Sequence, residues 1–464
     1  MHESLDPQKK QVSVQALQRC IEPDCNATYP LNEPIYVCAA CGGLLDIEYC
    51  FDKAFNATVL KKIWNERRSS AGARDSSGVW RHRELLPFAD SVPVVSMAEG
   101  NTPLYAAPRS ARYCGLQSLL LKHQGCNPTG SFKDTGMTTA ITQARLLSAR
   151  LVACASTGNT AASLAAYAAR AEIPCAILVP QGQVSHAKLA QALDYGGMVL
   201  EILGNFDVAM RVIRQLAEDN GVYLANSINP FRIEGQKTVV AELMQQLDWK
   251  VPDQVVVPGG NLGNSSALGK GFKELFDLQV IDSLPQINII QAEGAAPFAH
   301  LFSSRGQYRP VKDAVRKFSP VEQPTTRATA IKIGAPVSWK KALRAIEWTN
   351  GRALAVTEQE IADAKAIIGR DGIGCEPASA TTLAGIKRLV TERIIRKDEK
   401  VVAVLTGHLL KDTEYVIGYH QKRGSSAGSE LMTGSFSNHP IAVEATRDAI
   451  LKALEREQQK RQLP

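Results

Sequence analysis

A lysine lies at the expected start of a helix, near the end of the run GCNPTGSFKD over residues 125–134. The positive end of the helix dipole disfavours a cation there, and burial behind Phe132 would remove the amine from water. Both effects lower the pKa of the Lys133 amine, and a neutral amine is the form that builds a Schiff base with a carbonyl compound. The alternative is an ordinary solvated lysine at a helix end. Lys133 is therefore the first candidate for covalent chemistry.

Two polar loops that follow expected strands could bind phosphate groups. Residues 156–160 (STGNT) follow a strand at 151–155 and open a helix, where hydroxyls and backbone N–H groups form an anion site. Residues 259–264 (GGNLGN) make a glycine-rich turn into another helix, without the spacing of a Walker loop or a dinucleotide-binding loop. Taken singly, the first could be an ordinary helix cap and the second a plain turn.

A hydroxyl group, that of Thr406, directly follows another expected strand at 401–405. Taken singly, it too could be a helix cap. In open parallel sheets a ligand binds beyond the carboxyl ends of the strands, so this hydroxyl, the two loops and Lys133 are expected to share one cleft. Pyridoxal phosphate (PLP) requires a lysine, a phosphate site and a partner for its pyridine nitrogen. The combination favours a PLP site over four unrelated structural roles.

Five segments of the chain resemble, in order and spacing, the motifs of threonine synthases, which belong to the fold-type II (tryptophan synthase β-like) PLP enzymes. The resemblance extends from about residue 80 to 420 and is carried by EGNTPL (99–104), NPTGSFKD (127–134), STGNTAAS (156–163), NSINPFRIEGQKT (226–238) and TGH (406–408). Two positions depart from it: Leu409 stands where those enzymes usually have glycine, and Thr413 where they have proline. Neither position is a proposed catalytic group.

The resemblance implies a reaction in which O-phospho-L-homoserine and water give L-threonine and phosphate. Lys133 would carry PLP and act as the base, Asn159 would bind the 3′-oxygen of PLP, and Thr406 would meet its pyridine nitrogen. The PLP phosphate would be held by Gly260, Asn261, Leu262, Gly263 and Asn264. The substrate phosphate would be bound by Ser156, Thr157, Asn226 and Arg232, with Thr160 near the substrate carboxylate.

The fork of the Arg232 guanidinium matches a phosphate group, which supports that role independently. The alternative is a surface charge at a helix start. For His408 we expect a structural hydrogen bond rather than a part in catalysis.

Other functions stay open at this point. A sibling PLP enzyme could be a threonine or serine dehydratase, which would need no Arg232 or Asn226 aimed at a substrate phosphate. A synthase acting on phosphoserine, such as cysteate synthase, would need both residues. A binding or regulatory protein with an inactive PLP fold is a further alternative, and the presence of Lys133 argues against it.

Four cysteines near the start of the chain have metal-ligand spacing. Cys20 and Cys25 are separated by four residues and Cys38 and Cys41 by two, with glycines directly after the second pair. The pattern resembles a zinc ribbon, and an all-cysteine set would serve a structural Zn²⁺ because it leaves no open position for chemistry. The first spacing is looser than usual. The alternative is a set of reduced thiols without metal.

The elements that must position these residues alternate along the chain. Apolar runs expected to be strands (151–155, 175–179, 198–202, 223–225, 254–257, 287–291 and 401–405) alternate with helix-period segments (160–171, 185–194, 206–218, 234–247, 263–276 and 379–394). Such alternation predicts parallel sheets covered by helices. The expected fold is α/β, with two doubly wound parallel-sheet domains, a PLP cleft between them, and a small N-terminal Cys-rich ribbon.

The domain boundaries follow from composition and from the resemblance. Residues 1–50 would form the ribbon, 51–134 and 248–423 the large PLP domain, 135–247 the small α/β domain, and 424–464 a linker and a C-terminal helix over 443–458. The 464 residues carry a net charge of +7, with 6% aromatic residues and no basic block with interleaved aromatics. Nucleic acid is therefore not an expected partner.

The chain has no apolar run long enough for a membrane span and no signal-peptide pattern at its start. We therefore expect a cytoplasmic enzyme without a membrane partner. A homodimer is the family expectation.

Overall fold

The computed structural model describes residues 15–51, 56–181, 186–203, 206–302, 318–421 and 434–462. The chain divides into two compact units, residues 1–411 and 412–464, which are treated separately below. Two parallel sheets and a small antiparallel sheet form the framework of the first unit. The expected α/β class is thereby confirmed.

The larger sheet has six strands in the order β12-β11-β10-β13-β5-β4. Their bounds are β4 Leu104–Ala106, β5 Leu120–His123, β10 Gln254–Pro258, β11 Gln286–Ala292, β12 Arg352–Val356 and β13 Val401–Leu405. Five strands run parallel, and the edge strand β4 pairs antiparallel with β5. The central strands β10 and β13 are buried along their whole length, which explains why they are continuous apolar runs.

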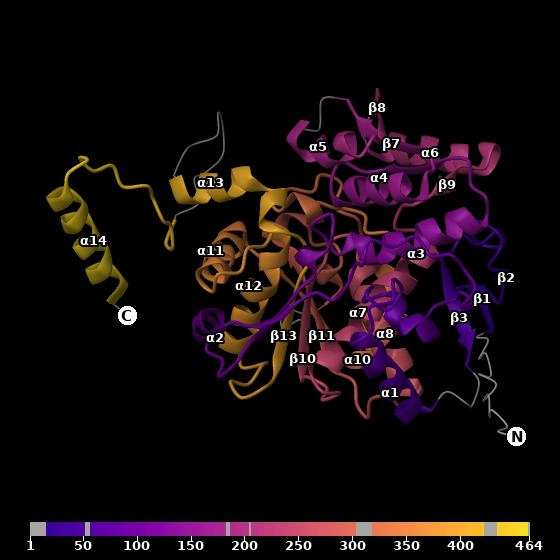
Figure 1. The fold of residues 1–464 in the computed structure, drawn as a ribbon, viewed down its shortest axis with the longest axis horizontal. Coiled ribbons are helices and arrows are strands. Elements are labelled where there is room, and N and C mark those ends of the chain that lie inside the picture. Colours follow the sequence, from indigo (N-terminus) through magenta and orange to yellow (C-terminus); the bar gives the residue numbers. More distant parts are fainter. Residues whose placement is uncertain are drawn as a thin grey trace, which may run out of the picture. The chain divides into compact units, whose positions relative to one another are not determined.

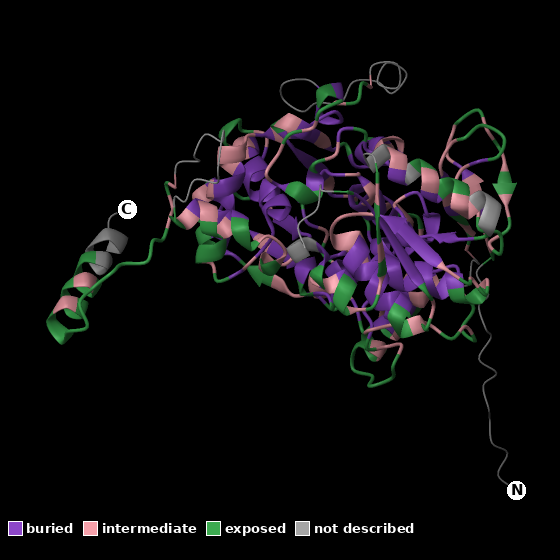
Figure 2. Ribbon diagram, turned by 90° about the horizontal axis from the view of Figure 1, so that it is seen from above, coloured by how far each residue is buried: buried purple, intermediate pink, exposed green. Residues whose placement is uncertain are grey.

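The smaller sheet has four parallel strands in the order β8-β7-β6-β9. They are β6 Val152–Ala155, β7 Cys175–Pro180, β8 Met198–Ile202 and β9 Tyr223–Leu224. All four agree with the predicted strands to within one or two residues. In Figure 1 this sheet, with α4 and α6, lies above the larger one, and Figure 2 shows buried strands inside the first unit. Strands β6 and β7 are buried, whereas the edge strand β8 is mostly exposed.

Helices cover both parallel sheets. Those of the first unit are α1 Ala57–Arg68, α2 Pro108–Cys114, α3 Lys133–Leu146, α4 Asn159–Ala171, α5 His186–Asp194, α6 Phe206–Asn220, α7 Pro230–Gln246, α8 Gly263–Asp277, α10 Trp339–Thr349, α11 Glu358–Arg370 and α12 Pro377–Thr391, with short 3-10 turns η1 Trp80–Leu85, η2 Gln124–Cys126, η3 Glu293–Ala295, η4 Ala299–Leu301, η5 Thr329–Ile331 and η6 Leu409–Lys411. Helix α7 begins at Pro230 rather than at the predicted residue 234, because Asn229 caps it and Pro230 occupies its first turn.

Helices α3 and α7 pack unusually closely. A Cβ atom added at Gly235 would lie 1.9 Å from the carbonyl oxygen of Thr135, and one added at Gly136 would lie 2.7 Å from that of Arg232. Glycine is therefore required on both helices at this crossing. The crossing fixes the first turn of α3, which carries Lys133, against the first turn of α7, which carries Arg232.

The Cys-rich segment forms a three-stranded antiparallel sheet in the order β2-β1-β3, with β1 Gln15–Cys20, β2 Thr28–Tyr29 and β3 Leu45–Cys50. It docks on the helices of the larger sheet through charged groups. Lys270 of α8 donates to Asp46 (3.0 Å) and to the Ile47 carbonyl (2.6 Å), and Lys341 of α10 donates to the Leu45 carbonyl (2.5 Å).

The second unit contains α13 Thr413–Gln421 and α14 Arg447–Gln462. The C-terminal helix was predicted over 443–458 and is found four residues further along. Most of the predicted Gly/Ser-rich linker lies outside the described residues. Among the described helices, none combines the length and apolar character needed to cross a membrane.

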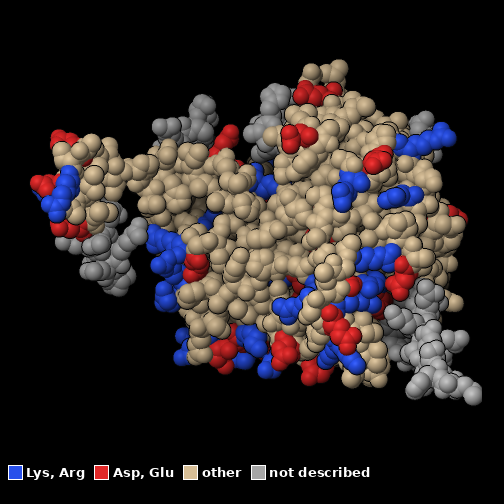
Figure 3. All heavy atoms as spheres, in the orientation of Figure 1, with Lys and Arg blue, Asp and Glu red and all other residues tan. Residues whose placement is uncertain are grey.

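Basic and acidic side chains are interspersed on the face of the first unit drawn in Figure 3.

The structure also contains elements that were not predicted. They include the helices at 57–68 and 339–349 and the strands at 104–106, 120–123 and 352–356. The boundaries of the predicted domains stay a prediction, since the described contacts join residues up to 411 into one unit.

Candidate active site

Lys133 is the first residue of α3, and its Nζ lies 4.2 Å from the centre of the Phe132 ring. Burial and the positive charge of Arg232 lower the pKa of the Lys133 amine to about 7, while the carboxylate of Glu376 acts in the opposite direction. The surroundings of Lys133 thus favour the neutral amine that covalent chemistry requires.

Asp134 anchors the loop before Lys133. Its buried carboxylate accepts hydrogen bonds from the backbone N–H of Thr129 (2.7 Å), the hydroxyl of Thr129 (2.6 Å) and the hydroxyl of Ser163 in α4 (2.6 Å). Desolvation raises the pKa of the Asp134 carboxyl to about 6. These bonds fix the residues around Lys133 to the start of the neighbouring helix.

A second polar group surrounds Thr406, directly after β13. The Oγ of Ser379 accepts from the backbone N–H groups of Thr406 (2.8 Å) and Gly407 (3.2 Å), so its own proton is left for the Thr406 hydroxyl at 3.1 Å. Thr406 in turn donates to Glu376 (3.2 Å). The amide of Asn159, at the start of α4, donates to the other oxygen of Glu376 (3.0 Å).

Glu376 therefore joins two predicted site residues, Asn159 and Thr406, and sequence reasoning missed it. Its side chain is buried, and desolvation raises the pKa of its carboxyl, which the two hydrogen bonds partly offset. A Cβ added at Gly407 would lie 2.2 Å from the Glu376 carboxyl carbon, so the glycine after Thr406 makes room for this acid. No local signal in the sequence distinguishes Glu376 from an ordinary glutamate before the proline that opens a helix.

The segment from Ser156 to Thr160 turns from β6 into α4, as predicted, and all five residues are half-buried. The Ser156 hydroxyl accepts from the backbone N–H of Gly158 (3.3 Å). Asn226 follows β9. Its amide oxygen accepts from the backbone N–H of Ala155, and its amide nitrogen donates to the Ala155 carbonyl, both at 3.0 Å. It thus lies beside Ser156, at the same strand ends, but most of its amide is already engaged in joining the two strands.

The glycine-rich turn from Gly259 to Asn264 connects β10 to α8. Leu262 adopts a left-handed conformation (φ 64°) as the cap of α8, and the first backbone N–H groups of a helix lack partners within it. The side chain of Asn261 donates to Ser227 and accepts from the backbone N–H of Val337 (2.6 Å). The predicted glycine-rich turn therefore lies next to the 226–232 segment, and its binding of an anion stays a prediction.

Arg232 is buried in the first turn of α7, with 2% of its surface exposed. One Nη donates to the Ala225 carbonyl (3.1 Å), while Nε is buried without a partner, and no described carboxylate forms an ion pair with it. Desolvation lowers the pKa of the guanidinium to about 10. A buried cation without a counter-ion is costly, and a bound anion would remove that cost.

The residues around Lys133 fit PLP. Besides Arg232 Nε, three buried polar atoms in this region lack hydrogen-bond partners: Ser131 Oγ, Gln124 Nε2 and Asn264 Oδ1. Gln124 and Asn264 contact one another (3.3 Å), which brings the loop after β5 to the glycine-rich turn. Buried polar groups without partners are costly, and a polar ligand would supply those partners.

His408 accepts from the backbone N–H of Leu410 (3.2 Å), in accord with the structural role expected for it.

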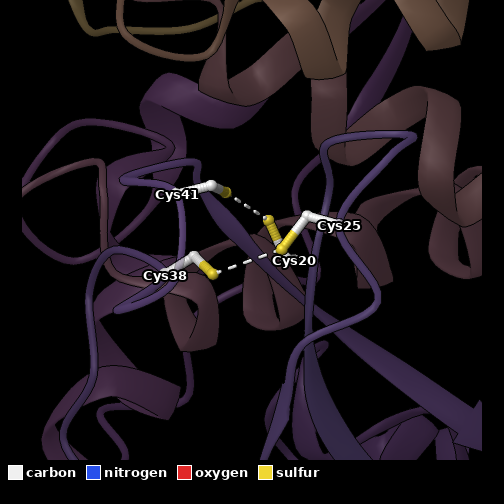
Figure 4. A group of neighbouring side chains, drawn as sticks. All are labelled: Cys20, Cys25, Cys38 and Cys41. Atoms are coloured by element: carbon white, nitrogen blue, oxygen red, sulfur yellow. Dashed lines mark hydrogen bonds between the residues drawn. The ribbon is translucent and has the colours of Figure 1, made fainter.

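The four predicted cysteines converge on one point, as Figure 4 shows. Their sulfur atoms all lie within 4.8 Å of one another, with Cys20 and Cys41 at 3.4 Å and Cys25 and Cys38 at 3.7 Å. Tetrahedral Zn–S bonds of about 2.3 Å place sulfurs about 3.8 Å apart, so the set fits Zn²⁺. The hydroxyl of Tyr29 lies 3.2 Å from Cys38 and lowers the pKa of that thiol to about 6, whereas burial raises the pKa of the Cys20 thiol to about 12.

Comparison with solved structures supports the fold. The processed form of threonine deaminase isoform 2 from Solanum lycopersicum superposes with a TM-score of 0.57 at 22% identity, over 68% of this chain and 82% of that one. Maize serine racemase gives a TM-score of 0.55 at 21% identity, over 67% and 89%. At this identity the similarity concerns the fold alone.

Sequence comparison is more specific. Residues 95–407 match the family model described as pyridoxal-phosphate dependent enzyme. The threonine synthase of Methanocaldococcus jannaschii is 47% identical over 86% of this chain and 94% of its own, and that of Methanosarcina acetivorans is 44% identical over 94% and 98%. The chain is a PLP-dependent enzyme with a ribbon-like Cys₄ segment, and it belongs to the threonine synthase family.

Proposed function

We propose that this enzyme converts O-phospho-L-homoserine and water to L-threonine and phosphate. The observation that carries this proposal is Arg232, a buried guanidinium that has no counter-ion among the described residues and whose charge lowers the pKa of Lys133. The phosphate group of the substrate would bind to this cation, close to the reactive amine. The names and the 44–47% identity of the relatives support the same activity.

When bound, PLP would withdraw electrons from the amino acid attached to it. Lys133 would hold it through Nζ, Asn159 would bind its 3′-oxygen, and the turn of Gly260, Asn261, Leu262, Gly263 and Asn264 would bind its phosphate. Thr406 would present its hydroxyl to the pyridine nitrogen. A hydroxyl leaves that nitrogen largely unprotonated, which favours elimination and replacement on the substrate side chain over transamination.

Lys133 is proposed as the base. Its Nζ, with a pKa of about 7, would be largely neutral above that pH; it would take a proton from the substrate carbon next to the amino group and return a proton to a carbon further along the substrate side chain. The substrate phosphate would be bound by Arg232 together with Ser156, Thr157 and Asn226, and the carboxylate would lie near Thr160 at the start of α4. Arg232 would then stabilise the phosphate as it leaves.

The test is to incubate the PLP-loaded enzyme with O-phospho-L-homoserine and to measure phosphate and threonine together. We expect matched amounts of both from the wild type and neither from Lys133→Ala. Phosphate accompanied by 2-oxobutyrate would mean a dehydratase-like enzyme. Turnover of phosphoserine without turnover of O-phospho-L-homoserine would mean a sibling synthase.

We also propose that the enzyme acts as a homodimer in the cytoplasm. The support is family membership, and sedimentation of the full chain would test the dimer. Zn²⁺ in the Cys20, Cys25, Cys38 and Cys41 set would be structural, since all four positions are thiolates.

A further inference from the structure

A polar cavity of about 250 Å³ lies among α1, η1, the loop before β4 and the C-terminal half of α7. It shares no lining residue with the site around Lys133. Its lining includes Arg68 at the end of α1, Arg81 in η1, Asn101, and Glu242 of α7. The proposed function assigns it no role.

Arg81 is the unusual member of this lining. Only 4% of its surface is exposed, its Nε is buried without a partner, and its guanidinium has no hydrogen bond or ion pair with any residue in the described part of the chain. Burial lowers the pKa of Arg81 and the nearby charge of Arg68 adds to this, while the carboxylates of Glu242 and Asp75 act in the opposite direction. A cation in this position is stabilised by an anion that enters the cavity.

The carboxylates of the lining already have cations of their own. Asp75 accepts from Arg83 at 2.7 Å. Glu242 forms a buried ion pair with Lys122 and accepts from the backbone N–H groups of Asn101 (2.7 Å) and Thr102 (2.8 Å). Neither carboxylate forms an ion pair with Arg81 or Arg68 among the described residues, so the hydrogen-bond donors of these two guanidinium groups are left for a ligand.

We propose that this cavity is a second anion site, which binds a phosphate group, free or carried by a small molecule, through Arg81 and Arg68. Guanidinium forks match phosphate oxygens in geometry and charge. The volume exceeds what one phosphate ion fills and leaves room for a small organic substituent. The site adjoins the catalytic machinery, because Gly100, next to Asn101, donates its N–H to Asn127 (2.8 Å) in the loop before Lys133.

Calorimetric titration of the PLP-loaded full chain with inorganic phosphate tests this proposal, because bound PLP fills the cofactor's own phosphate site. Arg232→Gln removes the proposed substrate-phosphate site, so the binding that persists in this variant reports the second site. We expect one phosphate per chain in R232Q, and about tenfold or greater weakening when R68Q or R81Q is added. Arg68 is exposed, so R68Q keeps the test valid even if R81Q fails to fold.

The matched control is R170Q in the same R232Q background, since Arg170 is an exposed arginine on α4. It should leave phosphate binding unchanged. A second titration with O-phospho-L-homoserine distinguishes an esterified phosphate from the free ion. The proposal is overturned if R232Q binds no phosphate, or if its remaining binding is the same with and without R68Q. Turnover is not the readout, so failure here is separate from failure of the proposed function.

Discussion

Lys133 lies between two groups of opposite charge, and both act on the same amine. Arg232 lowers the pKa of Lys133 and Glu376 raises it, with burial as the larger effect. Arg232 lies in the first turn of α7, and Glu376 directly precedes α12. Glutamine removes the charge at either position, and at Glu376 it also keeps the shape of the side chain. The effect of each charge on the pKa of Lys133 can therefore be measured separately.

In the enzyme freed of cofactor, the rate of PLP loading should follow the neutral fraction of Lys133 and rise with pH through about 7. Arg232→Gln should move this midpoint to higher pH, because a positive neighbour is removed. Glu376→Gln should move it to lower pH, because a negative neighbour is removed. Absorbance near about 410 nm, expected for the lysine-bound cofactor, follows loading. A shift of both variants in the same direction would contradict this arrangement.

The burial of Lys133 also affects stability. Its folded pKa of about 7 lies below the unfolded value, so the unfolded chain binds more protons between those two values. The free energy of unfolding of the apo wild type should therefore rise as pH increases above 7. Lys133→Met lacks this penalty, so its stability advantage over the wild type should be greatest at and below pH 7 and shrink toward pH 10. Urea unfolding over this pH range measures the difference, and a constant difference would refute the burial of the amine.

Much of the site could be predicted because most of its residues directly follow a strand or begin a helix. Lys133, Asn159, Thr406 and the 259–264 turn are all of this kind. Glu376 could not be predicted, because its importance lies in two partners that are 217 and 30 residues away in sequence. Nothing local marks a glutamate before a proline as part of an active site.

At the scale of elements, the crossing of α3 and α7 determines how Lys133 faces Arg232. No side chain fits at Gly235, since its Cβ would meet the backbone of Thr135. The positions of α7 and of several other helices and strands could be predicted to within a few residues. The crossing of α3 and α7 could not, because it depends on contacts between distant parts of the chain. The start of α7 at Pro230 could have been predicted from its Asn-Pro cap, whereas the polar run at 57–68 carries too weak an apolar stripe to indicate a helix.

Gly235→Ala should force α3 and α7 apart, destabilise the protein by about 1–3 kcal/mol or more, and reduce turnover by displacing Lys133 from Arg232. Gly369→Ala is the matched control, because Gly369 lies exposed in α11 with nothing within 4 Å of the added Cβ. That variant should gain roughly 0.5–1 kcal/mol. Chemical unfolding and turnover of both variants give the comparison, and a Gly235→Ala enzyme as stable and active as the wild type would exclude the close crossing.

At the scale of the whole molecule, the ribbon is joined to the catalytic framework by buried charges. Asp46 accepts from Lys270 (3.0 Å) and Arg344 (2.6 Å), and the Tyr49 hydroxyl donates to Glu234 of α7. The order of strands in the two parallel sheets could not be predicted, because pairing between distant segments leaves no local signature. The sheet class could be predicted, because fully buried strands are continuous apolar runs.

Removal of the metal should therefore destabilise the catalytic framework as well as the ribbon. Cys38→Ser should abolish binding of one Zn²⁺ per chain and lower the free energy of unfolding by about 3 kcal/mol. Loss of ribbon order would remove Asp46 from Lys270 and Tyr49 from Glu234, which would keep only the ion pairs they form within the catalytic framework. Turnover should fall because Glu234 lies two residues from Arg232. Cys50→Ser is the control, since Cys50 is exposed and outside the cluster. Equal metal content and melting temperature in both variants would show that the four thiols hold no structural metal.

The docking of the ribbon also bears on how the protein is made. Asp46 is separated from Lys270 by 224 residues, and Leu45 from Lys341 by 296. At ribosomal rates of about 5–20 residues per second, the ribbon leaves the tunnel roughly 10–60 s before the helices that bind it. During that interval the three short strands have only their own backbone pairing, the small cluster of Cys20, Cys38 and Leu45, and a metal bound by the four thiols to hold them together. The availability of Zn²⁺ at the ribosome would then govern how long this segment stays open to chaperones, proteases or oxidation during synthesis.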